Sequence, residues 1–561
     1  MLARLTPVLL LAAATAVTMS AGQLFAQPGA RASRPPVEVF TGTFITLDSL
    51  NPRAQALAVR AGRIVAIGTL RHVDSVVGRG ARHTRIAGFA LPGFADAHVH
   101  AAALGENLEI LDLRGASKEQ VLARVRGAAG RAGRGRWVRG AGWDQSFWRP
   151  PVFPTAAELD AVSLDHPVIL ERIDGHAVWV NSRAMQLAGI AAAAGDPPGG
   201  RILRDNAGAP NGVFVDEAME LVRRAMPALA PRERVRRLRL ALAQYAKWGL
   251  TSIHDAGVEL PDIEAWHALA RQGPLAVRVY AMSSASDATL RAVLAGGPEI
   301  GLSEGTFSLR AVKIVDDGAL GSRGARLSAP YTDEPGQLGF ALAPRGLLDS
   351  LIARSRARGF QVAVHAIGDA STHEVLNAFE RAGPAARAER FRLEHASMIR
   401  DEDLPRLAAL GVIASMQPVF VGEYSRFAES RVGAARLPWV YRTRDVFATG
   451  AVVAAGTDFP ASDTGDPILT LYSMVTRRGY DGTPANGWLP GQRVSVDAAL
   501  RAMTTGAAYA AFEETEGGTL RVGRRADLTV LSSDPYAVTA DELRAVKVLQ
   551  TIVGGRATYR R

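Results

Sequence analysis

Two histidines, His98 and His100, stand two positions apart in the segment Phe94-Ala-Asp-Ala-His-Val-His and carry the first indication of chemistry in this chain. Successive side chains of a β-strand point to opposite faces, so a strand here places Asp96, His98 and His100 on one face. Two imidazoles on one strand face supply half of a metal site. The same pair is also compatible with histidines that only contact water. The interpretation therefore depends on what the rest of the chain adds.

Short apolar runs alternate with helical patterns through the middle of the chain, and these elements would position the two histidines. Such alternation is typical of βα units around a parallel sheet. We predict eight parallel strands, a number that favours a closed (β/α)8 TIM barrel of the α/β class. Their expected ranges are 94–100, 251–256, 277–282, 310–316, 361–367, 391–396, 412–417 and 451–457.

Segments rich in strand and turn patterns flank this body. Residues 37–88 and 515–561 are expected to form one small β-sandwich domain from both termini, and residues 89–514 the (β/α)8 barrel. About 150 residues separate His100 from Thr251, far more than one crossover helix requires. The excess, at about 125–235, predicts an inserted subdomain after the first strand.

The N-terminus predicts export. Residues 1–26 contain one arginine, then an apolar run rich in Leu and Ala, then small residues up to Ala26, which is the pattern of a signal peptide. The apolar run is shorter than the roughly 20 residues of a membrane-spanning helix. We therefore expect no stable membrane insertion after signal removal, and a periplasmic or secreted protein.

Composition narrows the chemistry further. The formal net charge is +10, but the arginines are scattered rather than clustered, so no nucleic-acid binding is expected. The chain has no cysteine, which restricts metal ligands to histidine, carboxylate and modified lysine. Only four of its 65 basic residues are lysines. Lysine can lose its proton and arginine cannot, so Lys313 on an expected barrel strand is of interest.

Polar side chains end several of the expected strands at the rim where barrel enzymes hold their chemistry. Beyond the first strand they are Lys313, His365, His395 and Asp458. One such histidine alone is more readily explained as structural, whereas the full set favours metal binding. Lys313 also fits an unmodified salt bridge with Asp316 or Asp317.

Together these motifs resemble the amidohydrolase superfamily of metal-dependent hydrolases. The resemblance is strongest to its binuclear branch and to amidohydrolase family 3, with the YtcJ-like amidohydrolases and N-substituted formamide deformylases. It extends from about residue 38 to the C-terminus. The segments that carry it are Gly93–His100, Gly142-Trp-Asp, Asp174-Gly-His, Val312–Arg323, Val364–Asp369, Leu393-Glu-His-Ala, Gly456-Thr-Asp and Gly523–Leu528.

The resemblance implies two divalent metal ions, with Zn²⁺ expected because imidazole and carboxylate are its usual ligands without thiolate. Lys313 would be N6-carboxylated and bridge both ions. Asp458 would also be catalytic, as general base and then acid. A hydroxide between two cations about 3.5–4 Å apart is a nucleophile at neutral pH. The metal ligands that the resemblance implies are His98 and His100 for one ion, His365 and His395 for the other, and Lys313 and Asp458.

Four further residues are candidates for substrate binding. His176 and His254 could contact a substrate oxygen or could cap loops. Trp143 could line the pocket, although aromatic residues of an insertion more often form its own core. Asp317, four positions after Lys313, is the fourth candidate.

The expected function is an exported amidohydrolase that hydrolyses a non-peptide C–N bond, such as that of an N-formyl or N-acyl amine, in a small-molecule substrate. An ester, lactone or cyclic-amide hydrolase is the first alternative, because the same nucleophile attacks any activated carbonyl. A non-catalytic binding or regulatory protein is the second, although the intact ligand set argues against it. The sequence leaves a homodimer open.

Overall fold

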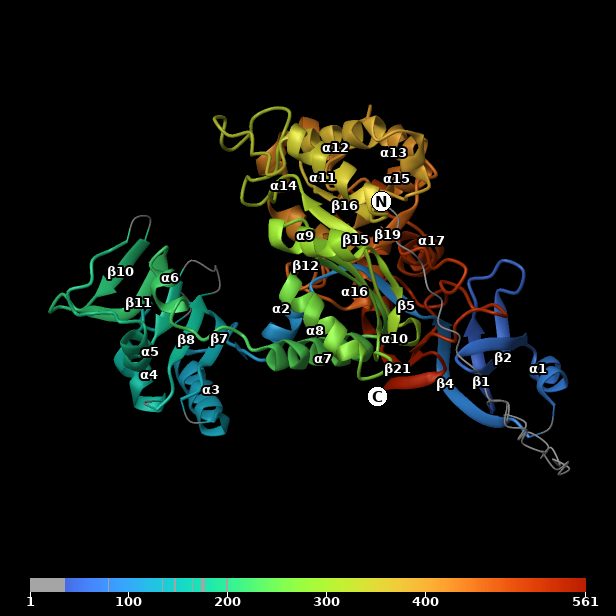
Figure 1. Ribbon diagram of the computed structural model, residues 1–561, viewed down its shortest axis with the longest axis horizontal. Helices are drawn as coiled ribbons and strands as arrows, with labels where there is room; N and C mark the ends of the chain where they lie inside the picture. Colours follow the sequence, from blue (N-terminus) through green and yellow to red (C-terminus); the bar gives the residue numbers. More distant parts are fainter. Residues whose placement is uncertain are drawn as a thin grey trace, which may run out of the picture.

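A computed structural model describes residues 36–78, 80–133, 135–145, 148–163, 165–172, 177–197 and 200–561 (Figure 1). The predicted signal peptide and His176 lie outside these ranges. Within them, no helix combines the length and the apolar character needed to cross a membrane. Three sheets organise the described chain: a central barrel, a sheet built from both ends of the chain, and the sheet of an insertion.

The central sheet confirms the predicted barrel. Its eight parallel strands neighbour one another in chain order and form a nearly closed ring. Most of their residues are buried, as expected for parallel strands that are covered on both faces. The strands are β5 (Phe94–Val99), β12 (Leu250–Val258), β13 (Arg278–Ser284), β15 (Phe307–Val315), β16 (Gln361–Ala366), β17 (Arg392–His395), β18 (Ile413–Met416) and β19 (Val453–Ala455), with the short β14 (Glu299–Gly301) beside β15.

The ring closes between β5 and the segment after β19. The backbone N–H of Asp458 donates to the carbonyl of His98 at 2.6 Å. The buried carboxyl group of Asp96 spans the same seam, where it accepts from the backbone N–H of Thr457 at 2.9 Å and from its hydroxyl at 2.7 Å. Barrel closure therefore places two segments with expected metal ligands side by side.

Helices cover the outside of the barrel, and α7 (Pro231–Lys247) shows why they form. Proline stands in its first turn, and Glu233 accepts a hydrogen bond from the backbone N–H of Ala230. Leu238, Leu242 and Tyr245 recur at the helical period and are buried in the main core. Other helices of this body are α2 (Ala101–Asn107), α8 (Leu260–Ala270), α9 (Asp287–Gly296), α10 (Leu302–Gly305), α11 (Arg345–Ala357), α12 (Asp369–Arg381), α13 (Leu404–Leu410), α14 (Val421–Arg436), α15 (Thr443–Ala448), α16 (Pro467–Thr476), α17 (Val496–Arg501) and α18 (Ala507–Ala510).

The two ends of the chain share one seven-stranded sheet, in the order β22-β21-β20-β4-β1-β2-β3. Strand β4 leads directly into the first barrel strand through Gly93, where a Cβ would lie 2.0 Å from the hydroxyl of Thr251. Only glycine fits this junction. The elements are β1 (Val37–Ile45), β2 (Arg53–Arg60), β3 (Arg63–Gly68), α1 (Leu70–Val77), β4 (Arg82–Pro92), β20 (Leu528–Leu531), β21 (Val548–Val553) and β22 (Arg556–Arg560).

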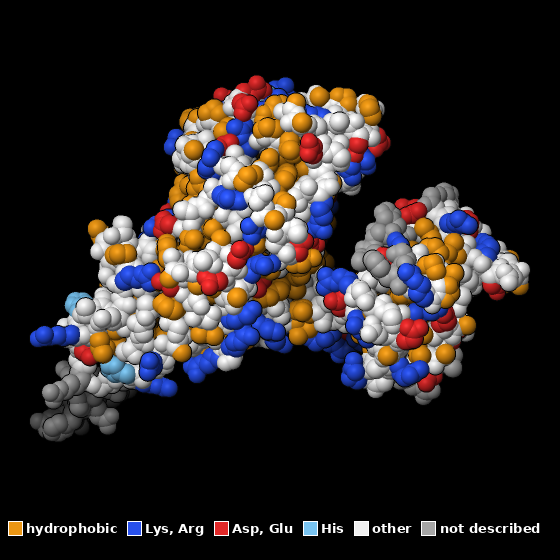
Figure 2. Space-filling model, turned by 180° about the vertical axis from the view of Figure 1, so that it is seen from behind, with side chains coloured by type: hydrophobic (Ala, Val, Ile, Leu, Met, Phe, Trp, Pro, Cys, Tyr) orange, Lys and Arg blue, Asp and Glu red, His pale blue; other side chains and the backbone are white. Residues whose placement is uncertain are grey.

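The insertion has its own six-stranded sheet and its own core, and Figure 2 shows it as a lobe beside the barrel. Ion pairs such as Arg136–Glu233 and Arg139–Glu106 join it to α7 and α2. Its elements are β6 (Leu111–Asp112), α3 (Lys118–Arg131), β7 (Val138–Trp143), α4 (Ala156–Ser163), β8 (Val168–Arg172), β9 (Ala177–Val180), α5 (Ser182–Leu187), β10 (Gly200–Arg204), β11 (Pro210–Asp216) and α6 (Met219–Arg223).

Candidate metal centre

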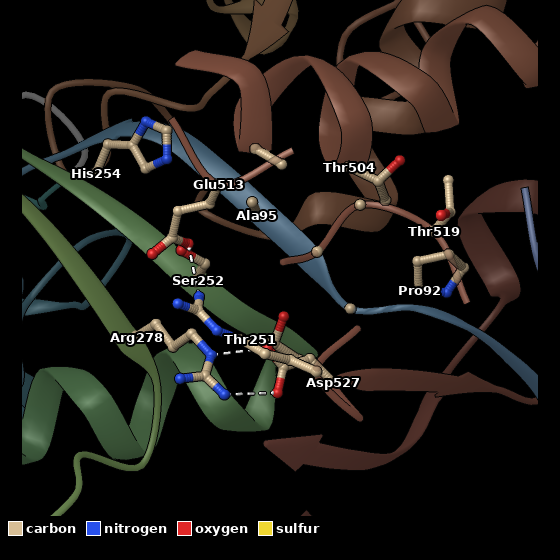
Figure 3. Close-up of a pocket in the computed structure, with 15 residues that line it drawn as sticks. Pro92, Ala95, Thr251, Ser252, His254, Arg278, Thr504, Glu513, Thr519 and Asp527 are labelled. Carbon is tan, nitrogen blue, oxygen red and sulfur yellow. Dashed lines mark hydrogen bonds and ion pairs between the residues drawn. The ribbon is translucent and has the colours of Figure 1, made fainter. Parts of the chain in front are cut away.

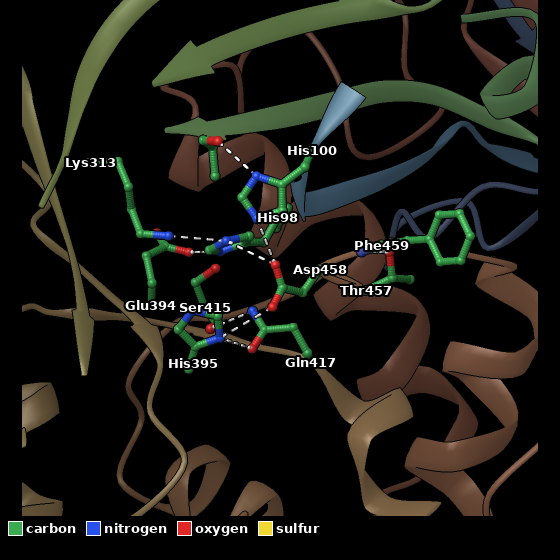
Figure 4. A network of polar contacts seen from close by, with 12 residues as sticks. His98, His100, Lys313, Glu394, His395, Ser415, Gln417, Thr457, Asp458 and Phe459 are labelled. Atoms are coloured by element: carbon green, nitrogen blue, oxygen red, sulfur yellow. Dashed lines mark hydrogen bonds and ion pairs between the residues drawn. The ribbon is translucent and has the colours of Figure 1, made fainter. Parts of the chain in front are cut away.

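The carboxyl ends of the barrel strands bring together side chains that are far apart in the sequence (Figure 4). The Nζ of Lys313, on β15, lies 3.1 Å from the Nε2 of His98 on β5. Asp458, just beyond β19, places its Oδ1 2.9 Å from the Nε2 of His100 and 3.5 Å from that of His98. Four of the six expected metal ligands thus form one contact cluster.

The other two expected ligands, His365 and His395, pack against the same cluster. The rings of His365 and His395 have centroids 4.3 Å apart, and the rings of His98 and His395 have centroids 4.8 Å apart. The Nδ1 of His395 lies 3.9 Å from the second carboxylate oxygen of Asp458. All six side chains therefore meet at one end of the barrel.

Neighbouring acceptors fix the orientation of three imidazole rings. The Nδ1 of His98 lies 2.5 Å from a carboxylate oxygen of Glu394, and the Nδ1 of His100 lies 2.9 Å from the carbonyl of Ala256. The Nδ1 of His395 lies 2.9 Å from the amide oxygen of Gln417. A proton held on Nδ1 leaves the lone pair of Nε2 free, which is the form that binds a metal.

The backbone is strained at two of these residues. His395 has a φ of 71° and Asp458 a φ of 63°, both in the left-handed region that residues with a Cβ rarely adopt. Such conformations persist where the surrounding structure imposes them, and they concentrate at functional sites. At His395 the turn ends β17, which directs the imidazole toward the cluster.

The protonation states suit metal binding. Burial lowers the pKa values of His98, His365 and His395 well below the ordinary histidine value, so the rings are neutral at neutral pH. Burial also lowers the pKa of Lys313, against the opposing effect of nearby carboxylates. Burial raises the pKa of Asp458, but the neighbouring His98 and other basic groups outweigh this effect, and the net pKa is lower than usual.

The donor set fits a pair of divalent cations. His98, His395 and Asp458 each offer one ligand atom, and these atoms lie within 4.8 Å of one another. The Nε2 of His365 is buried and has no hydrogen-bond partner among the described residues. A buried polar atom without a partner is costly unless something absent from the protein satisfies it. Imidazole nitrogens and carboxylate oxygens are ligands suited to Zn²⁺ and similar ions.

Comparison with known proteins identifies the family. A model described as the amidohydrolase family matches residues 88–559. The chain belongs to this amidohydrolase family. This finding confirms the resemblance derived from the motifs, and it makes the protein a metal-dependent hydrolase by family.

Individual relatives agree with the assignment. This amidohydrolase is 30% identical to the putative amidohydrolase YtcJ of Bacillus subtilis, over 93% of this chain and 99% of that protein. It is 28% identical to the N-substituted formamide deformylase of Arthrobacter pascens, over 92% of this chain and 97% of that protein. A solved structure of an uncharacterized metal-dependent hydrolase from Pyrococcus horikoshii matches with a TM-score of 0.75 at 28% identity, over 90% of this chain and 99% of that one.

Two of the candidate substrate-binding residues of the amidohydrolase are within the barrel. The Nδ1 of His254 lies 3.0 Å from a guanidinium nitrogen of Arg392, and His254 lines a cavity at the opposite end of the barrel (Figure 3). Asp317 accepts three backbone N–H groups, from Arg326, Ile367 and Gly368, and lies 3.5 Å from the Nε2 of His365. Both residues therefore make structural contacts. Asp317 lies beside the metal centre, and His254 lies toward the opposite end of the barrel.

Trp143 lies in the core of the insertion. It has no exposed surface, its indole N–H donates to the carbonyl of Leu170 at 2.8 Å, and its ring stacks on Trp148 with centroids 5.8 Å apart. The structure thus places this side chain in local packing rather than beside the metal ligands. His176 belongs to the residues that the structure does not describe.

Replacing Trp143 with alanine should therefore destabilise the insertion without changing the metal centre. A fully buried tryptophan that is cut back to alanine costs about 3–5 kcal/mol. We expect a lower melting temperature, an unchanged metal content and an unchanged KM for whichever substrate is found. An increased KM at an unchanged melting temperature would instead place Trp143 in the substrate pocket.

The carboxyl group of Asp96 leads to a second prediction, on how stability depends on pH. Burial raises the pKa of its carboxyl group to about 7, against the lowering effect of its hydrogen bonds to Thr457 and His98. A carboxyl group with a raised pKa in the folded state stabilises the protein fully below pH about 4, and this contribution is lost as the pH rises to about 7.

Asparagine at position 96 should make the same contacts without this loss. Its amide oxygen can accept the two backbone N–H groups, and its NH₂ can donate to the hydroxyl of Thr457. The melting temperature of Asp96→Asn relative to wild type should therefore rise steadily between pH 5 and 8. A constant difference across this range would show that Asp96 is ionised throughout.

No supporting role was predicted for three residues that hold the ligands in place. Glu394 and Gln417 orient His98 and His395, and Arg392 pairs with Glu394 at 2.6 Å. Arg392 and Glu394 stand two positions apart on a fully buried strand, so they face the same side. Two charged residues at that spacing in a buried strand were the available signal.

Proposed function

We propose that this protein is an exported, metal-dependent amidohydrolase that hydrolyses the C–N bond of a non-peptide amide, such as an N-formyl or N-acyl amine. The observation that carries the proposal is the convergence of four imidazoles, Lys313 and Asp458 at the mouth of the barrel. In this proposal Asp458 is both ligand and catalytic residue. The residues that would hold two Zn²⁺ ions are His98, His100, Lys313, His365, His395 and Asp458.

Two bound divalent cations would polarise a substrate carbonyl and lower the pKa of water. Lys313 would contribute as a carbamate, which forms from its neutral amine and carbon dioxide with release of a proton. Its buried position and lowered pKa favour the neutral amine that forms a carbamate. The sparing use of lysine elsewhere in the chain is consistent with a special role at this position.

Asp458 carries the proton transfers in this proposal. Asp458 is buried, and its two carboxylate oxygens face the histidine cluster, one toward His100 and the other toward His395. Such a carboxylate can take a proton from the attacking water and then deliver it to the leaving nitrogen. An amine is a poor leaving group unless it is protonated, which is why an amide hydrolase needs this residue.

Support for the amide class comes from chemistry and from a relative. The name of the Arthrobacter pascens protein specifies N-substituted formamides as its substrates, and it covers nearly this whole chain. Export is supported by the sequence of residues 1–26 alone. The mass of the mature protein and its recovery from the periplasm or the medium would test that part, and retention of residues 1–26 in a cytoplasmic protein would refute it.

The decisive experiment is amine release from N-formyl, N-acetyl and cyclic amides by Zn²⁺-loaded protein, with a chelator-treated sample as control. Metal-dependent release from any N-formyl or N-acyl member supports the proposal. No release from protein that binds two ions per chain would contradict the amide class, and ester and lactone substrates would then be tested. Protein that binds less than one ion per chain after loading would contradict the binuclear site itself.

A further inference from the structure

The interior of the barrel contains a buried arginine one layer below the metal centre. Arg392 of β17 has no exposed surface. Other barrel strands contribute alanines to the interior, and Ala256, Ala311 and Ala363 belong to one small buried cluster. A buried guanidinium keeps its charge, so the protein must provide acceptors for it.

Arg392 contacts three other barrel strands. One terminal nitrogen donates to the carbonyl of Ala97 on β5 at 2.7 Å and to the hydroxyl of Ser415 on β18 at 3.1 Å. The other lies 3.0 Å from the Nδ1 of His254 on β12. The Nε donates to one carboxylate oxygen of Glu394 at 2.6 Å. The guanidinium therefore links its own strand, β17, to strands across the barrel and beside it.

These contacts converge on one expected ligand. The second carboxylate oxygen of Glu394 lies 2.5 Å from the Nδ1 of His98. The carbonyl of Ala97, which also accepts from Arg392, immediately precedes His98 in the chain. Arg392 thus holds the backbone before His98 directly. It holds the His98 ring through Glu394, whose contact with His98 is drawn in Figure 4.

We propose that Arg392 and Glu394 are positioning residues that keep the Nε2 of His98 free and aimed at the metal centre. The inference rests on the proposed metal site. Each oxygen of Glu394 accepts from a different donor, one from His98 and one from Arg392. This requires two acceptor atoms, which a carboxylate supplies and an amide does not.

The same pair could stabilise the barrel without any effect on the metal. Another charge pair at low exposure, Arg278–Asp527, shows what such a purely structural pair looks like, because neither member contacts a metal ligand among the described residues. It lies at the opposite end of the barrel and lines the cavity of Figure 3. It therefore offers a matched control.

The test is Zn²⁺ binding by Glu394→Gln, measured by competition with a chromogenic chelator. Its amide turns an NH₂ toward either His98 or Arg392, so the ring loses its fixed orientation or the guanidinium loses its acceptor. We expect one of the two ions to bind about 10–100-fold more weakly, the typical cost when such a supporting group is lost. The visible spectrum of the Co²⁺-loaded variant should also change, since it reports ligand geometry.

Two further variants separate positioning from folding. Asp527→Asn should lower the melting temperature and leave both affinities and the Co²⁺ spectrum unchanged. Glu394→Asp keeps the charge beside Arg392 but is too short to reach His98, so it should lose affinity as Glu394→Gln does.

Wild-type affinity for both ions in Glu394→Gln would overturn the inference. Wild-type affinity in Glu394→Asp would also overturn it, because the buried charge alone would then suffice. If wild-type protein itself bound no Zn²⁺, the proposed function would fail together with this inference, and that outcome is visible before any variant is compared.

Discussion

Lys313→Ala should lose about 10³-fold or more in kcat/KM on any amide that the wild type hydrolyses. In the proposed site Lys313 bridges both ions, and the loss of such a ligand would cost the reaction several kcal/mol. The Nζ of Lys313 lies 3.1 Å from His98 in a site where Lys313 is only 5% exposed. The alanine variant leaves a space the length of the lysine side chain. Added acetate or propionate should enter this space, supply a carboxylate, and restore part of the activity in steady-state assays.

Lys118→Ala is the matched control for this prediction. Lys118 pairs with Glu158 at 2.7 Å inside the insertion and contributes no atom to the metal centre. It should keep wild-type kinetics and should not respond to added acids. Full activity in Lys313→Ala would contradict a bridging role for this residue.

Asp458→Asn should lower kcat by about 10²–10⁴-fold, the usual contribution of a general acid–base group. The asparagine amide keeps the shape of the side chain but can neither take nor deliver the proton. KM should change less than kcat, since the proton transfers belong to the transition state. Metal content has to be measured in parallel, because Asp458 is also an expected ligand.

Asp463→Asn tests whether any nearby carboxylate would serve. Asp463 follows Asp458 in the same loop, but its side chain is 41% exposed and pairs with Arg426 at 3.0 Å. We expect nearly wild-type kcat for this variant. Equal losses in the two variants would mean that the loop, rather than the carboxylate at position 458, controls the rate.

The barrel could be predicted because each of its strands is recognisable from its own short apolar run. All eight expected ranges overlap the observed strands, and the polar residues at their ends are the ones that converge. Residues such as His98, Lys313 and Asp458 were accessible to prediction because barrel topology alone places strand ends on one rim. We could therefore predict that these residues come together without knowing any distance between them.

Other contacts depend on neighbours that the sequence does not reveal. His254 and Arg392 are 138 positions apart, and only the folded barrel shows that they touch. From its place near an expected strand end, His254 could equally have contacted substrate or capped a loop. Trp143 was ambiguous for a related reason, since an aromatic residue in an insertion gives no sign of which way it faces until the insertion's own core is seen.

The seam of the barrel has a consequence for how the protein matures. Asp96 and Thr457, which meet at the seam, are 361 positions apart in the chain, so the cluster of His98 and Asp458 exists only after the last strand has docked against the first. Closing so long a loop is entropically costly and comes late in folding. A chain truncated before β19 would hold most of its ligand residues and still lack a working centre. The time at which metal affinity appears during refolding would therefore mark the final closure of the ring.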